Sequence, residues 1–268
     1  MTAADALLRR AADLAARRRR RPEATYRLQF HAGFTFRDAT AVVPYLADLG
    51  VTHVYASPYL KARPGSTHGY DIVDHSVLNP EIGTPDDYAA FVAALQQHGL
   101  GQVLDIVPNH MGVATHDNPW WNDVLENGPA SRYGAYFDID WRASDRAEYR
   151  DRVLLPVLGD SYGEVLEAGQ LRLAFDGGAF RIHYWERWFP LAPRSYAYVL
   201  GNRADELERR LGPEDPDLIE YQSILTAVTY LPDRTTTDPV RRAVRQREKE
   251  VIKRRLATLV DGDPAVAA

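Results

Sequence analysis

The chain has 268 residues, enough for one large domain or two small ones. Its net charge of −5 gives no general support for nucleic-acid binding, where a basic footprint is expected. The absence of cysteine excludes disulfides and thiolate metal sites, and no apolar run reaches the roughly 18 residues of a membrane-spanning helix. We therefore expect no nucleic-acid partner, no membrane partner and a cytoplasmic location.

Residues 1–22 form an arginine-rich segment that we expect to be a helix. Leu7, Leu8 and Leu14 precede the run Arg17 to Arg21, and Pro22 ends the segment. A secretory signal peptide has its positive charge before its apolar core, so the order here is reversed. A transit peptide or a nucleic-acid patch is an alternative, but a solvated helix that leads into the fold is the favoured interpretation.

Residues 23–110 alternate between strands and helices. Strands are predicted at residues 24–30, 51–56 and 103–107, helices at 35–49 and 84–98, and a long loop at 57–83. Thr35 is a predicted N-cap with an acid three residues later, and Gly50 and Gly99 end the two helices.

Near-continuous apolar strands that alternate with helices indicate a parallel sheet covered on both faces. A (β/α)8 barrel and a doubly wound sheet both fit. The first turn reads Gln29-Phe-His-Ala-Gly33 and lacks a Gly-x-Gly-x-x-Gly phosphate loop, which weakens the nucleotide-binding option.

The alternation stops after residue 110. Residues 111–200 are aromatic-rich and irregular, and all five tryptophans lie there. One hairpin is predicted, with alternating apolar residues at 171–175 and 180–184 around the turn Asp176-Gly-Gly178. Residues 201–268 are predicted to be helical. The basic side chains of the last helix are interpreted as a solvated face, and they are Arg241, Arg242, Arg245, Arg247, Lys249, Lys253, Arg254 and Arg255.

Candidate site residues follow the second and third strands. The third strand carries Asp105 and, after Pro108, delivers Asn109 and His110. Chemistry in barrels and open α/β sheets takes place at the carboxyl ends of strands, so these side chains are candidates. The loop after the second strand adds His68-Gly-Tyr-Asp71, whose ring and polar groups suit a sugar. The alternative is a satisfied core Asp105 with capping residues around it, a core Tyr70, and His68 and Asp71 as loop caps.

These segments resemble the α-amylase superfamily, glycoside hydrolase family 13. The first signature of that family is similar to Asp105-Ile-Val-Pro-Asn-His110, and His68-Gly-Tyr-Asp71 resembles the segment placed just before it. A finer resemblance is to the maltooligosyltrehalose synthase family, over about residues 24 to 200. It is carried by Tyr26-Arg-Leu-Gln-Phe30, Val54-Tyr-Ala-Ser-Pro-Tyr59, Gly65-Ser-Thr-His-Gly-Tyr-Asp71, Asn118-Pro-Trp-Trp-Asn-Asp-Val-Leu-Glu-Asn-Gly-Pro129 and Leu154-Leu-Pro-Val-Leu-Gly159.

The resemblance implies an α/β fold, namely the first three β/α units of a (β/α)8 TIM barrel. Residues 23–110 would be that part of the barrel, residues 111–200 an inserted aromatic-rich domain B, and residues 201–268 a helical segment. The implied activity converts the reducing-end α-1,4 bond of a maltooligosaccharide into an α,α-1,1 bond by retaining intramolecular transglycosylation. A retaining mechanism needs two carboxyl groups about 5–5.5 Å apart. The implied partners are the maltooligosaccharide substrate and, as the next enzyme of the pathway, a maltooligosyltrehalose trehalohydrolase.

The resemblance also assigns roles to single residues. His110 resembles the histidine that hydrogen-bonds the sugar in subsite −1, and Tyr70 resembles the ring that stacks under that sugar. Asp105 resembles the aspartate that orients the catalytic groups, and it is not the nucleophile. Asn109, His68 and Asp71 are further substrate-binding candidates. No cofactor and no metal are predicted, because nothing beside Asn109 assembles a calcium cage of six to eight oxygens.

The family's nucleophile follows the fourth strand in a Gly-x-Arg-x-Asp-type motif, and no such motif follows residue 200 here. We therefore expect the chain to be an N-terminal part of a longer enzyme, inactive alone. Three alternatives stay open. The first is another reaction within the superfamily, amylosucrase-like or hydrolytic. The second is a non-catalytic carbohydrate-binding domain. The third, a metal hydrolase, is weak because the histidines form no helical ligand pair.

Overall fold

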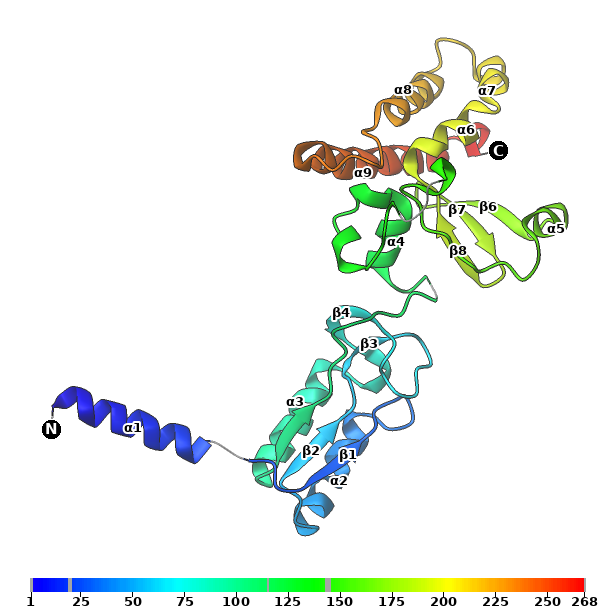
Figure 1. Ribbon diagram of the computed structural model, residues 1–268. Helices are drawn as coiled ribbons and strands as arrows, with labels where there is room; N and C mark the ends of the chain where they lie inside the picture. The colour runs from blue at the N-terminus through cyan, green and yellow to red at the C-terminus, as the bar shows by residue number, and fades with distance from the viewer. Residues whose placement is uncertain (1, 19–20, 115, 143–145, 268) are drawn as a thin grey trace. The chain divides into compact units, whose positions relative to one another are not determined.

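The computed structural model describes residues 2–18, 21–114, 116–142 and 146–267 (Figure 1). For residues 3 and 14–18 it describes the backbone alone. The chain divides into two compact units, Met1–Asp117 and Asn118–Ala268.

The first unit contains a parallel three-stranded sheet in the order β1-β2-β5, as the alternation predicts. Its helices and strands are α1 (Ala3–Arg18), β1 (Thr25–Leu28), α2 (Phe36–Asp48), β2 (His53–Ala56), β3 (Leu60–Ala62), β4 (Ile72–Leu78), the 3-10 helix Pro80–Ile82, α3 (Pro85–Gln97) and β5 (Gly101–Leu104). Thr35 and Thr84 both form capping boxes, which confirms the predicted helix starts.

One face of this sheet is covered by α2 and α3. The buried core joins strand residues such as Leu28, Val54 and Ala56 to helix residues such as Phe36 and Phe91. Phe30, Phe36 and Tyr59 pack edge-on or tilted, with ring centroids 5.0–5.3 Å apart. Because strand side chains alternate, the residues between these apolar ones lie on the opposite face of the sheet.

Two predictions in this unit are wrong. The loop predicted at 57–83 contains the antiparallel pair β3–β4, in which Lys61 pairs with Asp74. Ladder hydrogen bonds satisfy backbone groups that an extended loop would have left unpaired. The third strand ends at Leu104 and not at Val107, since its partner β2 ends at Ala56. Asp105 is therefore the first residue past the strand, although its N–H still donates to the Ala56 carbonyl at 2.9 Å.

The N-terminal helix α1 runs from Ala3 to Arg18, and Leu7 and Leu8 on it are both 69% exposed. Arg19 and Arg20 of the predicted arginine cluster lie outside the described residues. No helix in the described part of the chain combines the length and apolarity that crossing a bilayer requires.

The second unit combines a small antiparallel sheet, β6-β7-β8, with helices (Figure 1). Its elements are α4 (Pro119–Asn127), α5 (Tyr162–Glu167), β6 (Leu171–Asp176), β7 (Ala179–Tyr184), β8 (Arg187–Pro190), α6 (Tyr196–Gly201), α7 (Ala204–Leu211), α8 (Pro216–Tyr230), α9 (Pro239–Gly262) and α10 (Pro264–Ala267), with short 3-10 helices at 128–130, 134–136, 147–149 and 193–195. The predicted hairpin is confirmed, with Phe175 opposite Phe180. Its turn glycines, Gly177 and Gly178, both have positive φ.

The solvated basic face predicted for the last helix is wrong in part. Arg245 and Lys249 of α9 are only 2% and 3% exposed. With Ile252, Leu256 and Leu259 they follow helical spacing, so they lie on the buried face of α9. They are buried because α4 supplies partners, Glu126 and Asp123 for Lys249 and Asn127 for Arg245. Sequence periodicity alone cannot reveal partners more than 100 residues away.

Candidate functional site

A polar cluster occupies the sheet face of the first unit that α2 and α3 leave uncovered. The strand register aligns Arg27 with Tyr55 and Tyr55 with Val103. Asp105 lies two residues beyond Val103, on the same face. The three polar side chains thus project from the carboxyl ends of adjacent parallel strands, where barrel and α/β sites form.

Hydrogen bonds in this cluster converge on one oxygen of Asp105. The Tyr55 hydroxyl donates to Oδ2 at 2.9 Å, the Tyr70 hydroxyl donates to the same oxygen, and Arg27 NH1 lies 3.6 Å from it. The Asp105 side chain is 19% exposed and that of Arg27 37%. The carboxylate is therefore fixed in place but still open to solvent.

These contacts change the acidity of the cluster. The Tyr70 hydrogen bond, followed by those of Tyr55 and the charge of Arg27, holds the pKa of Asp105 below its usual value against partial desolvation. The Asp105 hydrogen bond and desolvation raise the pKa of Tyr55. The Tyr70 hydrogen bond raises the pKa of Arg27. The cluster is thus a carboxylate held by two phenol hydroxyls and a guanidinium.

Tyr70 reaches the cluster from the loop between β3 and β4, whose conformation is set locally. Gly69 has φ +76°, and a Cβ there would lie 3.0 Å from the Pro58 carbonyl oxygen, so glycine is needed. Ser66 donates to Asp71 Oδ1 at 2.5 Å and accepts from the Gly69 N–H at 3.1 Å. These contacts set the local loop conformation from which the Tyr70 hydroxyl reaches Asp105.

The other predicted site residues surround Tyr70. His110 Nε2 lies 3.1 Å from the Tyr70 carbonyl oxygen. His68 Nδ1 accepts the Tyr70 N–H at 3.0 Å, and the two rings lie 5.9 Å apart. Asp71 lies 3.7 Å from Arg63 Nε, and Asn109 is exposed on the loop after β5. The structure therefore brings Asp105, Tyr70, His110 and His68 together, with Asp71 next to His68 in the same loop. Asn109 is exposed, and it contacts none of them through a recorded hydrogen bond in the described part of the chain.

A largely apolar cavity of about 230 Å³ lies beside the cluster. Leu104, Asp105 and Ile106 form one wall, and Tyr59, Ile72 and His75 contribute to the rest. Ile106 is 67% exposed in this chain. The carboxylate thus lies at the border of an apolar hollow, a combination that is typical of small-molecule sites.

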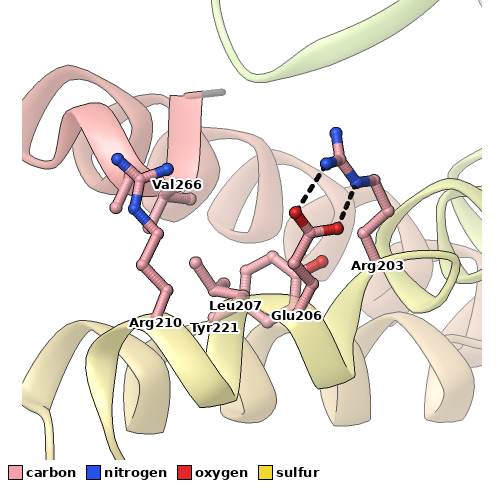
Figure 2. A pocket seen from close by; sticks show the side chains of 7 residues that line it. Arg203, Glu206, Leu207, Arg210, Tyr221 and Val266 are labelled. Carbon is pink, nitrogen blue, oxygen red and sulfur yellow. Dashed lines mark hydrogen bonds and ion pairs between the residues drawn. The ribbon is translucent and has the colours of Figure 1, made fainter.

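One cavity of the second unit, of about 110 Å³, lies between α7, α8 and α10 (Figure 2). Glu206 lies at its edge, where Arg203 donates to both of its oxygens, at 2.8 and 2.7 Å. Tyr221, in its wall, donates its hydroxyl to the Leu200 carbonyl. Since these polar groups are engaged with each other or with the backbone, we favour the Asp105 cluster as the site.

The sequence predicted Asp105 and Tyr70 as site residues but did not single out Arg27 and Tyr55, whose side chains contact them. Both lie in segments that carry the resemblance, and strand alternation would have placed them opposite the apolar Leu28, Val54 and Ala56. Within the described ranges, no three His, Asp or Glu side chains gather as metal ligands.

Comparison with known proteins supports the expected resemblance. Residues 36–161 match the family model of the alpha-amylase catalytic domain. A protein of Mycobacterium tuberculosis that is assigned as a maltooligosyl trehalose synthase is 43% identical over 169 residues, which cover 58% of this chain and 21% of the relative. An intracellular maltogenic amylase of Bacillus subtilis is 41% identical over 95 residues, 35% of this chain and 15% of the relative.

Solved structures agree. The maltooligosyltrehalose synthase of Arthrobacter ramosus superposes with a TM-score of 0.56 at 47% identity, covering 64% of this chain and 21% of that one. A hypothetical maltooligosyl trehalose synthase of Sulfolobus tokodaii gives 0.55 at 34% identity, covering 72% and 24%. The resemblance to the α-amylase superfamily and to its maltooligosyltrehalose synthases is confirmed. The chain spans about a fifth of the length of the synthases that it matches.

Proposed function

We propose that this chain, similar over residues 36–161 to the alpha-amylase catalytic domain, forms a maltooligosaccharide-binding part of a maltooligosyltrehalose synthase. The observation that carries the proposal is the convergence of Arg27, Tyr55 and Tyr70 on Asp105 at the carboxyl ends of three parallel strands. The apolar hollow beside Asp105 supports it, because sugar rings present apolar C–H faces.

In this proposal the sheet of the first unit is the opening part of a (β/α)8 barrel. Residues 23–110 supply its first three β/α units, residues 111–200 are the inserted domain B, and residues 201–268 are a helical segment. The parallel order β1-β2-β5 with helices between the strands supports this assignment.

The site residues take the following roles. Tyr70 stacks under the sugar in subsite −1, His110 hydrogen-bonds it, and Asp105 orients the catalytic groups without acting as nucleophile. Asn109, His68 and Asp71 complete the substrate-binding rim. The hydrogen bond between the His110 ring and the Tyr70 carbonyl supports the proposal that Tyr70 and His110 contact the same sugar.

The proposed whole-enzyme reaction is the conversion of the reducing-end α-1,4 bond of a maltooligosaccharide to an α,α-1,1 bond with retention. We propose that the nucleophile and the acid/base do not lie among residues 1–268, that no cofactor is used, and that the location is cytoplasmic. A maltooligosyltrehalose trehalohydrolase would then consume the product.

Calorimetric titration of the chain with maltopentaose tests the proposal. We expect binding without turnover, and Tyr70→Ala should weaken binding at least about 10-fold because the stacking face is lost. Tyr45→Ala is the matched control, since Tyr45 is a 60% exposed ring on α2.

Two results would count against the proposal. Failure of the wild-type chain to bind maltopentaose at millimolar concentration would remove the binding role. Release of glucose or shorter maltooligosaccharides would show hydrolysis by this chain and remove the assignment of the catalytic carboxylates to residues outside it.

A further inference from the structure

We propose that Arg27 is a positioning residue that commits the one hydroxyl proton of Tyr70 to Asp105, so that Tyr70 meets a sugar with its ring face alone. The inference rests on the proposed sugar-binding role of this site. In this inference Gln29 and Tyr55 hold the Arg27 side chain in place through their contacts with it.

The direction of the hydrogen bonds around Tyr70 is fixed by chemistry. Arg27 NH2 lies 2.9 Å from the Tyr70 hydroxyl oxygen, and a guanidinium can only donate. The Tyr70 oxygen therefore accepts from Arg27, and its single proton is free to be donated elsewhere. Its other near neighbour is Asp105 Oδ2, which can only accept when ionised. The hydroxyl is thus engaged in both directions.

Arg27 is held by its own strand and by the loop that carries Tyr70. Its NH2 group also donates to Gln29 Oε1 at 3.2 Å. Gln29 in turn donates through Nε2 to the Thr67 carbonyl at 3.0 Å, three residues before Tyr70. Gln29 therefore connects the end of β1 to the loop by hydrogen bonds. The Arg27 guanidinium is in contact with both Tyr55 and Tyr70.

Tyr55 differs from Tyr70 although both donate to the same carboxylate oxygen. The Arg27 Cζ atom lies 4.9 Å from the centroid of the Tyr55 ring, so the guanidinium covers a face of that ring. The Tyr55 ring thus supports the guanidinium of Arg27 from one side, and the Tyr55 hydroxyl is a second hydrogen-bond donor to Asp105. Tyr70 is the ring of the pair that is left to stack on a sugar.

The same network leaves one side of Asp105 unused. Within the described ranges, every side-chain hydrogen bond to Asp105 ends on Oδ2. The Oδ1 atom of this cavity-lining residue therefore has free acceptor capacity. We assign it to a donor that arrives with the ligand or from a neighbouring catalytic group.

The test combines nuclear magnetic resonance titration of the Asp105 carboxyl group with maltopentaose calorimetry, on the full chain. Arg27→Met should raise the pKa of Asp105, because the charge and the hydrogen bond that lower it are lost, and should weaken maltopentaose binding about 10-fold. Tyr70→Phe should raise that pKa but change the dissociation constant less than about 3-fold, because the ring face remains. The double variant should shift the pKa by less than the sum of the two single shifts, since Arg27 acts partly through the hydroxyl of Tyr70 and partly through its own charge.

Arg37→Met is the matched control, because Arg37 pairs with Asp87 at 2.6 Å on α3 and touches none of these groups. It should leave Asp105 and binding unchanged. Additive pKa shifts, an unmoved Asp105 in Arg27→Met, or a 10-fold loss of binding in Tyr70→Phe would overturn the inference while the proposed function stands. A wild-type chain that does not bind maltopentaose ends the proposed function, and the role of the Tyr70 ring face falls with it.

Discussion

Each of the two units contains a carboxylate surrounded by hydrogen-bond or ion-pair partners. The two carboxylates differ in their burial and in how many of their oxygens are bound. Glu126 of the second unit is buried, its side chain 7% exposed, and both of its oxygens are bound, one by Lys249 at 2.6 Å and one by Lys253. Asp105 of the first unit is 19% exposed and takes its hydrogen bonds on one oxygen. A fully paired, buried charge supports packing, whereas a half-open carboxylate with spare acceptor capacity suits a ligand.

The causes of the pKa changes show the same contrast. Burial acts to raise the pKa of Glu126, but the charges of Lys249 and Lys253 more than offset it, so the pKa ends below its usual value. For Asp105 the largest contribution to the lowered pKa is the hydrogen bond from Tyr70, and the opposing effect of desolvation is smaller. The pKa of Glu126 is thus lowered mainly by ion pairing, and that of Asp105 mainly by hydrogen bonds from tyrosine hydroxyls.

The largest effect is expected for Lys249→Met, which leaves Glu126 and Asp123 buried with one cation fewer. Removing one partner of a buried ion pair costs about 3–5 kcal/mol. All five tryptophans lie in the second unit, at residues 120, 121, 141, 185 and 188, so denaturant unfolding followed by tryptophan fluorescence reports this unit. We expect its free energy of unfolding to fall by that amount.

The control for this variant is Arg203→Met, which breaks the ion pair with Glu206 on the surface of the same unit. Both side chains are more than half exposed, 65% and 54%, and solvent screening leaves such surface pairs with little effect on stability. Equal losses in the two variants would contradict the view that the Lys249 cluster supports packing.

The second prediction concerns the close backbone contact between α9 and the β6–β7 hairpin of the small sheet. A Cβ on Gly178 would lie 1.8 Å from the backbone carbonyl oxygen of Lys253, whereas one on Gly177 would meet nothing within 4 Å. Both residues have positive φ, so Gly177→Ala should cost about 1 kcal/mol from strain alone. Gly178→Ala should cost at least about 2 kcal/mol more, because backbone must move. Equal unfolding free energies for the two variants would contradict this contact.

The same contrast explains which features the sequence could predict. Local patterns predicted the capping box at Thr35, the parallel strands and the hairpin at residues 171–184. Motif resemblance added Asp105, Tyr70 and His110. Arg27 was missed because its role depends on strand register, and Lys249 because its partners lie 123 and 126 residues away. Hydrophobic periodicity records which residues are apolar, and it cannot show which charges will meet.

A smaller effect on stability is expected for Asp105→Asn. Asparagine keeps an acceptor for the tyrosine hydroxyls but loses the charge that Arg27 faces. Because the side chain is partly solvated, we expect a loss of about 1 kcal/mol in the first unit, measured by thermal unfolding with far-ultraviolet circular dichroism. Maltopentaose binding should weaken about 10-fold. A stability loss as large as that of Lys249→Met would show that the Asp105 cluster supports packing as well, which would remove the contrast.

The smallest effect concerns acid stability in the first unit. Hydrogen bonds from Arg37 and from the N-cap Thr84 lower the pKa of Asp87 to about 2, from 3.8 for the free side chain. A carboxylate whose pKa is lowered on folding stabilises the fold above its unfolded pKa, and this contribution is lost as the pH falls from about 4 to about 2. Asp87→Asn should therefore lower the melting temperature at pH 6 slightly and flatten its decline over that interval. Asp86→Asn, one residue earlier on the same helix, leaves the capping box intact and should keep the wild-type profile. If Asp87→Asn keeps the full decline, the acid sensitivity of this unit comes instead from other carboxylates whose pKa is lowered in the fold, such as Asp38 and Asp105.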